Sequence, residues 1–336
     1  VSAAREDKSA SHAVNDEAEM RAMVMSVRGE PVQKTLSVPP ALPRAELMRA
    51  SPASIEFRAA RDLKAFVDGL NARRATLTGD ERYHLAKALE ECQFTTTINE
   101  DLAAYSAKQR KQFLQGLTPG DPNNTKRIAA YDAADNTQRC VRFQGIKISQ
   151  KDIEGLYGAA AQQGDPRAQA RLLVAELNAK LSQSSRASEQ STNTRAPIVT
   201  DDFSRIVGLL QTRDPEAMMI VGNFLAQSAI ATQLHIGPNG EVPEPSAFLG
   251  AFSLVACDMT SDCVTLNREP QLACAYSGYC NAQTFEELYQ DFLASPWAYA
   301  QAARYRNIIH TAINTQNWSL IGLQPAPATV TSTSGP

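Results

Sequence analysis

Residues 153–177 contain the turn that most constrains how this chain can fold. The segment IEGLYGAAAQQGDPRAQARLLVAEL carries two helical patterns separated by Gly164, Asp165 and Pro166. Gly164 can end the first helix, because glycine adopts a positive φ without a Cβ clash. Asp165 can cap the second helix, and Pro166 suits its first position, where no intrahelical N–H partner is lost. The segment therefore predicts two helices joined by a short turn.

Related turns occur on either side of this segment. The sequence GDP occupies residues 120–122, and RDP occupies residues 213–215. Asp121 precedes Asp165 by 44 residues, and Asp214 follows Asp165 by 49. Periods of this length between helical patterns are typical of helix pairs that stack into a solenoid. With only 7% aromatic residues, we expect an all-α fold, a helix-pair (α-solenoid-like) array with a disulfide-bonded irregular C-terminal module.

Residues 159–173, AAAQQGDPRAQARLL, carry a resemblance to a known class of proteins. They resemble the end of one helix and the start of the next in Sel1-like proteins, which are α-helical repeat proteins similar to the tetratricopeptide class. The resemblance extends loosely over residues 83–225. It implies a scaffold that binds other proteins, and it implies no catalytic residues.

The six cysteines predict disulfide bonds. The last four have the spacing C-x5-C-x10-C-x5-C, whereas zinc sites usually use C-x2-4-C pairs with nearby histidines. Disulfides would place the protein in an oxidising compartment; the alternative is a set of buried free thiols. The pairs that we expect are Cys92–Cys140, Cys257–Cys274 and Cys263–Cys280.

Other features agree with an exported protein. The chain begins VSAARED without Met, and together with the cysteines this leads us to expect that a signal peptide has been removed and that the protein is periplasmic or secreted. Residues 257–280 resemble a cysteine-bearing segment near the C-terminus of secreted proteobacterial proteins. No apolar run approaches the roughly 18 residues of a transmembrane segment. A net charge of −3 argues against a nucleic acid partner.

Composition divides the chain into five parts. The ends and the middle are polar or rich in Pro, Ser, Thr and Gln, so they lack the apolar surface needed to order themselves. The expected parts are a mobile N-terminal arm (1–53), a helical-repeat domain (54–180), a linker or long loop (181–199), a C-terminal helical domain containing the module at 257–280 (200–323), and a disordered tail (324–336).

The catalytic motifs with the strongest signatures are absent from the sequence. It contains no G-x-S-x-G, H-E-x-x-H, P-loop or dinucleotide fingerprint, so we expect no cofactor and no metal. Glycoside cleavage needs only two facing carboxylates, and this class of reaction stays open.

The last helical pattern and one loop supply a candidate partner groove. Trp297, Tyr299 and Tyr305 could line a groove for a sugar or peptide, with His235 from a loop; the alternative is that the aromatic residues pack on the core. The function that we expect is a protein-binding scaffold or envelope-assembly factor. The alternative is a helical cell-envelope hydrolase that uses paired carboxylates, in which case peptidoglycan or polysaccharide would be bound.

Overall fold

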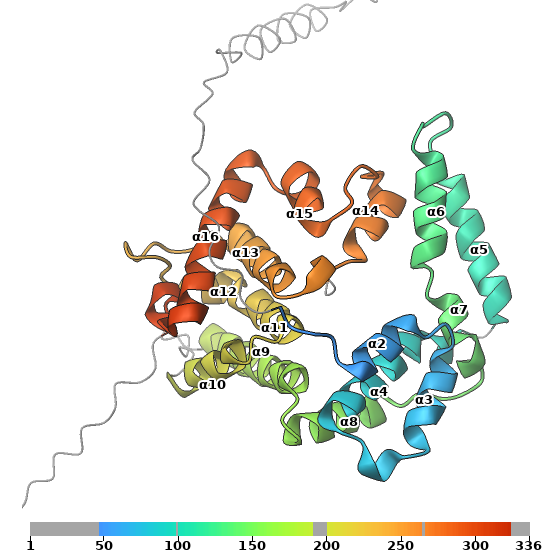
Figure 1. Cartoon of the computed structure of the whole chain (residues 1–336), viewed down its shortest axis with the longest axis horizontal. Coiled ribbons are helices and arrows are strands. Elements are labelled where there is room, and N and C mark those ends of the chain that lie inside the picture. The colour runs from blue at the N-terminus through green and yellow to red at the C-terminus, as the bar shows by residue number, and fades with distance from the viewer. Residues whose placement is uncertain (1–46, 99, 191–199, 264–265, 324–336) are drawn as a thin grey trace, which may run out of the picture. The chain divides into compact units, whose positions relative to one another are not determined.

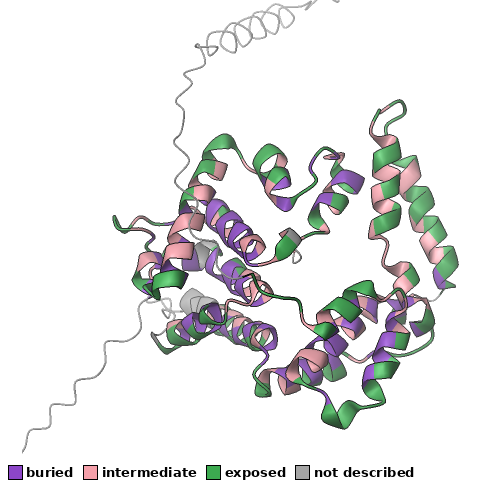
Figure 2. Ribbon diagram, in the orientation of Figure 1, coloured by how far each residue is buried: buried purple, intermediate pink, exposed green. Residues whose placement is uncertain are grey.

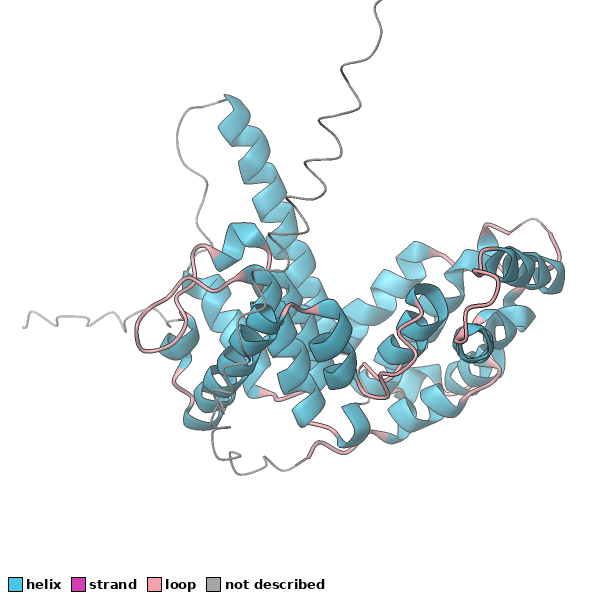
Figure 3. Ribbon diagram, turned by 90° about the horizontal axis from the view of Figure 1, so that it is seen from above, coloured by secondary structure: helices cyan, strands magenta, loops and turns pink. Residues whose placement is uncertain are grey.

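The structure, a computed structural model, describes residues 47–98, 100–190, 200–263 and 266–323 (Figure 1). These residues belong to one compact unit, Arg44–Pro336; the other unit, Val1–Pro43, lies outside the described residues. The described part is helical and contains no β-strand, only an isolated bridge between Ile236 and Glu241 (Figure 3). The all-α fold with disulfides is therefore confirmed. Most of the N-terminal arm and the whole tail at 324–336 lie outside the described ranges.

Two hydrophobic cores organise the helices. The N-terminal core draws its buried residues from Phe57 to Ala168, and the C-terminal core from Ala170 to Leu323. Figure 2 shows that the buried positions concentrate on the facing sides of these helices. The helices of the N-terminal half are α2 (Pro52–Ala59), α3 (Leu63–Asn71), α4 (Gly79–Cys92), α5 (Leu102–Gln115), α6 (Asn124–Ala134), α7 (Thr137–Cys140) and α8 (Gln150–Gln162).

The C-terminal half begins with a long helix. Its helices are α9 (Pro166–Gln190), α10 (Thr200–Gln211), α11 (Pro215–Leu225), α12 (Ser228–Ala231), α13 (Pro245–Asp258), α14 (Glu269–Ser277), α15 (Phe285–Leu288) and α16 (Pro296–Thr315), with a π-helical turn at Tyr289–Leu293. The pairs α4 with α8, α8 with α9, α9 with α11, α11 with α13 and α13 with α16 pack closely in chain order, as in a stacked array, whereas α6 and α14 form an equally close contact outside this order.

The turn between α8 and α9 has the geometry that its sequence predicts. Gly164 adopts φ +85°, and Asp165 Oδ1 accepts a hydrogen bond from the Ala168 amide at 3.0 Å. The RDP turn is built alike: Arg213 has φ 57°, and Asp214 Oδ1 accepts from the Ala217 amide at 2.8 Å. The GDP turn at 120–122 differs, because α6 begins only at Asn124.

Helix α9 corrects the expected boundary between the two halves. It continues to Gln190, so residues 181–190 are helical, whereas composition predicts a linker or long loop there. Serine and glutamine lower helix propensity only slightly, and the packed first turns of α9 extend through them. Ala168 lies in the N-terminal core, whereas Leu173 and Leu177 lie in the C-terminal core, so one helix serves both.

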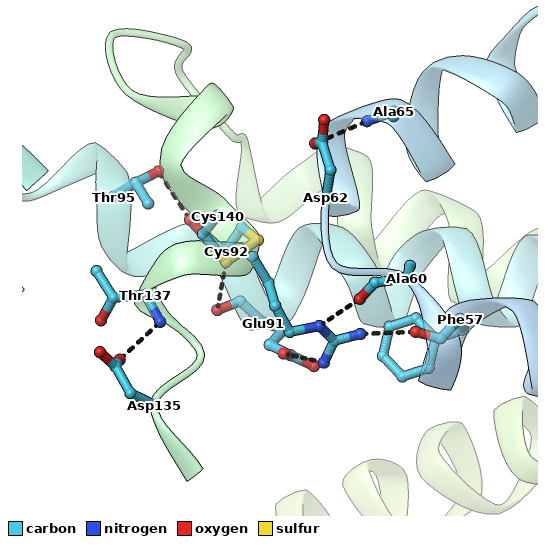
Figure 4. The surroundings of a disulfide bond; sticks show 11 residues. Phe57, Ala60, Asp62, Ala65, Glu91, Cys92, Thr95, Asp135, Thr137 and Cys140 are labelled. Atoms are coloured by element: carbon cyan, nitrogen blue, oxygen red, sulfur yellow. Dashed lines mark hydrogen bonds and ion pairs between the residues drawn. A yellow bond between two sulfur atoms is a disulfide. The ribbon is translucent and has the colours of Figure 1, made fainter. Parts of the chain in front are cut away.

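The Cys92–Cys140 disulfide is present as predicted (Figure 4). Both cysteines are fully buried, and their Cα atoms are 5.3 Å apart. Beside the bond, the Arg139 guanidinium donates to the carbonyl oxygens of Phe57 and Ala60 and to the Glu91 carboxylate. Burial lowers the pKa of Arg139. The bond and this arginine together join α4, α7 and the end of α2.

The other two disulfides have a different connectivity from the expected one. The bonds are Cys257–Cys263 and Cys274–Cys280, so the predicted pairs Cys257–Cys274 and Cys263–Cys280 are wrong. The reason is local: the chain folds back at each helix end. At the end of α14, Gly278 adopts φ +77°, which turns the chain so that Cys280 returns to Cys274. The module at 257–280 also contains a regular helix, α14.

The α5–α6 hairpin contributes almost nothing to either core. Leu102 is its only residue that is buried within the two helices. The Cys92–Cys140 disulfide closes the loop that contains the hairpin, and α6 packs against α14. Arg268 also donates to the Ala134 carbonyl at 2.8 Å. The disulfide at its base and the contact of α6 with α14 therefore hold the hairpin in place.

Among the helices that the structure describes, none combines the length and the apolar character of a membrane span.

Gly222 on α11 permits the close approach of α13. A Cβ atom at this position would lie 2.4 Å from Cγ of the fully buried Phe252. We expect Gly222→Ala to lower the free energy of unfolding by about 1–3 kcal/mol through overpacking. Gly155→Ala on α8 is the matched control, since nothing lies within 4 Å of its added Cβ; it should stabilise by about 0.5–1 kcal/mol. Urea denaturation of both variants tests the pair. The prediction would be contradicted if both substitutions changed the free energy of unfolding in the same direction.

Candidate functional site: a charged cavity between the two cores

A cavity of about 520 Å³ lies where the two cores meet. Helices α2 and α4 and the turn between α8 and α9 supply its N-terminal side, and the start of α11 with residues 260–261 supplies the other. Residues 48–51 also line it. Its volume lies within the range of small-molecule ligand pockets. The ionisable lining residues are Arg49, Arg58, Asp80, His84, Lys87, Asp165, Arg167, Asp214 and Glu216.

Asp80 accepts hydrogen bonds on the α4 side of the cavity. The Ser51 hydroxyl donates to Oδ1 at 2.9 Å, and the Arg167 guanidinium donates to the same atom at 2.6 Å. His84 Nδ1 lies 2.9 Å from the Asp80 carbonyl oxygen and 3.3 Å from its carboxylate. Burial alone would raise the pKa of Asp80, but the bonds from His84, Arg167 and Ser51 outweigh it and hold that pKa well below its usual value.

Arg167 bridges two carboxylates. Its guanidinium also donates to Asp165, whose side chain is almost completely buried. The guanidinium lies 4.3 Å from the centroid of the Tyr83 ring, a cation–π contact. Burial acts to lower the pKa of Arg167, but the two carboxylates outweigh it and raise that pKa. Arg167 therefore remains a cation that ties α9 to α4.

Glu216 forms a second bridge, between α11 and α4. Its Oε1 accepts from the Tyr83 hydroxyl and from Lys87 Nζ, each at 2.6 Å. Burial would raise the pKa of Glu216, but the Lys87 ammonium and the Tyr83 hydroxyl hold it below its usual value. Burial and the Glu216 charge raise the pKa of Tyr83 well above its usual value. The carboxylate is thus ionised and already occupied by partners from its own chain.

Asp214 differs from the other three carboxyl groups of the cavity. It is half-buried and caps α11 through the Ala217 amide, but no cation among the described residues pairs with it. Burial raises its pKa, and the hydrogen bond from the Ala217 amide and the more distant charge of Arg167 only partly oppose this. A desolvated carboxylate without a cation is unfavourable for folding, so Asp214 is the unsatisfied anionic position of the cavity.

The chain matches no protein-family model, no curated protein and no solved structure. Its function is therefore inferred from the charges and contacts of the cavity.

The residues predicted to form a partner groove do not come together at this cavity. Trp297 is 59% exposed, whereas Tyr305 is buried in the C-terminal core and its hydroxyl oxygen accepts from the Glu244 amide at 3.3 Å. The Tyr299 hydroxyl donates to Glu286 at 3.1 Å. His235 is exposed in its loop, with Nδ1 at 3.2 Å from the Gly240 carbonyl oxygen. None of the four lines the charged cavity.

Sequence reasoning missed the cavity residues, although two signals pointed to them. Asp80 and His84 are four residues apart on α4 and therefore share a face. The Asp-Pro turns at Asp165 and Asp214 predict only helix starts, yet both line the cavity. No three His, Cys, Asp or Glu residues in the described part are arranged to hold a metal ion.

Replacing Asp214 by asparagine should stabilise the free protein at pH 7. Asparagine caps helices as well as aspartate does, but it carries no desolvated charge. The gain should be about 0.5–2 kcal/mol, as for other single-site charge and cap optimisations. Because the folded pKa of Asp214 is raised, the destabilisation arises as the carboxyl ionises, so the difference should vanish as the pH falls below about 4.

Asp101 offers the matched control for this measurement. It caps α5 through the Ala104 amide at 3.0 Å but is exposed. Asp101→Asn should change stability by less than about 0.5 kcal/mol at either pH. Thermal or urea unfolding at pH 7 and pH 4 measures both variants. If Asp214→Asn were instead less stable than the wild type at pH 7, the carboxylate would have to be stabilised by a group other than its described contacts.

Proposed function

We propose that the protein is an exported scaffold that binds a charged segment of a partner protein in the cavity between its two cores. The observation that carries the proposal is the unpaired carboxyl of Asp214. Asp80, Asp165 and Glu216 are paired by Arg167 and Lys87, so a ligand cation would find its counter-charge at Asp214. Such a cation, from a lysine, an arginine or an amino terminus, would remove the cost of the desolvated charge.

The rim of the cavity supports a segment that also carries acidic groups. Arg49 and Arg58 line it, are exposed, and form no ion pair with a described residue. A peptide that presents a cation to Asp214 and carboxylates to these arginines would be complementary in charge. This is the pattern of a mixed-charge polypeptide rather than of a small apolar molecule.

Two features support the wider assignment. Three disulfides favour an oxidising compartment, in agreement with a periplasmic or secreted protein. The sequential packing from α4 to α16 agrees with a helical-repeat scaffold of the Sel1-like kind. An envelope-assembly role would follow if the partner that binds in the cavity is a protein of the cell envelope.

Cross-linking capture tests the proposal. The tagged protein, its Asp214→Asn variant and its Asp101→Asn variant are each exposed to envelope extract, and bound proteins are identified and quantified. We expect one stoichiometric protein partner for the wild type and for Asp101→Asn, and at least about tenfold weaker retention for Asp214→Asn, as for loss of one desolvated charge pair. Equal retention by both variants would refute binding at Asp214.

A cell-envelope hydrolase is the second candidate. The observation in its favour is that the pKa of Asp214 is raised while those of Asp80 and Glu216 are lowered in one cavity, since acid and base pairs are separated in this way. Against it, Asp80 and Glu216 are both bonded to groups of their own chain, so neither carboxylate is free to act as the general base. Release of soluble fragments from purified peptidoglycan, lost in Asp214→Asn, would favour the hydrolase.

A further inference from the structure

A second hollow, of about 300 Å³, lies between the α5–α6 hairpin and α14. Three aromatic rings line it, one from each helix: Phe113, Tyr131 and Tyr276. Phe113 and Tyr131 are stacked with their centroids 4.2 Å apart, and Tyr276 stands edge-on to both at 6.0 Å. Tyr276 is 63% exposed, so a ligand in the hollow can reach its ring.

The polar groups that line the hollow present no unpaired charge to a ligand. Arg127 donates to the carbonyl oxygens of Ala275 and Tyr276 and lies 3.6 Å from the Asp121 carboxylate, so its charge is engaged. Gln109 and Gln112, one turn apart on α5, also line the hollow, and neither side-chain amide bonds to a described residue. Each amide can both donate and accept hydrogen bonds.

These features select among ligand classes. A cationic ligand needs several open ring faces around a void, but Phe113 and Tyr131 are stacked and turn one face of each ring against the other. An anion would have to displace the partners of Arg127. A neutral ring that has one apolar face and several hydroxyl groups fits both the aromatic surface and the two amides.

We propose that this hollow binds an uncharged saccharide, with one sugar ring on the aromatic surface and its hydroxyl groups bonded to Gln109 and Gln112. The site is separate from the charged cavity and does not depend on it. The hairpin is held by the Cys92–Cys140 disulfide and by α14, so the three rings are positioned before a ligand arrives, which reduces the ordering cost of binding.

Isothermal titration of the full chain with chitotetraose, an uncharged β-1,4-linked oligosaccharide, tests the proposal, with cellotetraose as a second probe. We expect binding of at least one of them by the wild type, and about fivefold weaker affinity for Tyr276→Ala through loss of a stacking surface. Gln112→Ala should also weaken binding. Both positions are exposed, so the variants should fold; circular dichroism of each variant checks this before titration.

Trp297→Ala is the matched control, because Trp297 is an aromatic residue of similar exposure that lies outside the hollow. Its affinity should equal that of the wild type. The proposal is overturned if neither oligosaccharide binds, if Tyr276→Ala and Trp297→Ala lose affinity equally, or if an acidic oligosaccharide such as tri-galacturonate binds more tightly than both neutral probes.

Discussion

Replacing Arg167 by methionine should lower the free energy of unfolding by about 3–5 kcal/mol, the usual cost of removing one partner from a buried ion pair. The Arg167 side chain is only 10% exposed and bonds two carboxylates, Asp80 and Asp165. Methionine retains an unbranched apolar stem but leaves both carboxylates without their cation. Urea denaturation at pH 7 measures the loss.

An exposed arginine with the same type of bond provides the control. Arg205 donates to both oxygens of Glu176, but both side chains are more than 40% exposed. Arg205→Met should cost less than about 1 kcal/mol. Adding Asp165→Asn to Arg167→Met should restore part of the loss, because the asparagine retains the cap of α9 and removes one uncompensated charge. A cost for Arg167→Met no larger than that for Arg205→Met would contradict the prediction.

The same arginine sets the expected response to acid. Because the folded pKa of Asp80 is lowered, its interactions contribute stability at neutral pH, which is lost as the pH falls through that folded pKa. In Arg167→Met one of the bonds that lowers this pKa is missing. The acid limb of its stability profile should therefore be shallower than that of the wild type.

Removing the Cys92–Cys140 disulfide should cost about 4 kcal/mol in the chain-entropy treatment of a loop with a separation of 48 residues. A Cys92→Ala/Cys140→Ala protein leaves no buried polar atom at this position, so the loss reports the cross-link and the packing of two small side chains. Hydrogen exchange should show the α5–α6 hairpin opening first, since almost none of its residues is buried.

The Cys274–Cys280 disulfide is the comparison. Its separation is 6 residues, and the same treatment gives about 2 kcal/mol. The Cys274→Ala/Cys280→Ala protein should therefore lose less stability than the other double variant. If the two losses were equal, loop closure would not be the source of the difference.

Local signals explain why much of the architecture could be predicted. Gly164 and Asp165 act within one turn; backbone preference and side-chain capping decide such a feature without help from the rest of the fold. The Cys92–Cys140 pair followed by elimination from the remaining cysteines.

Features that depend on distant contacts could not be predicted in this way. The spacing of the last four cysteines is symmetric, so it does not distinguish the three connectivities. Tyr83 and Glu216 form a hydrogen bond beside the cavity although 133 positions separate them in the sequence. Hydrophobic periodicity does not predict such a contact. Tyr276 lines the aromatic hollow because α14 packs on the hairpin, whereas Tyr305 is buried in the C-terminal core.

Helix α9 has a consequence for dividing this protein into fragments. Its first turns complete the N-terminal core, and Leu173 and Leu177 complete the C-terminal one. If the chain is produced as two pieces separated between Gln190 and Thr200, the first piece carries an apolar surface that only the second can cover. The two pieces should therefore reassemble on mixing.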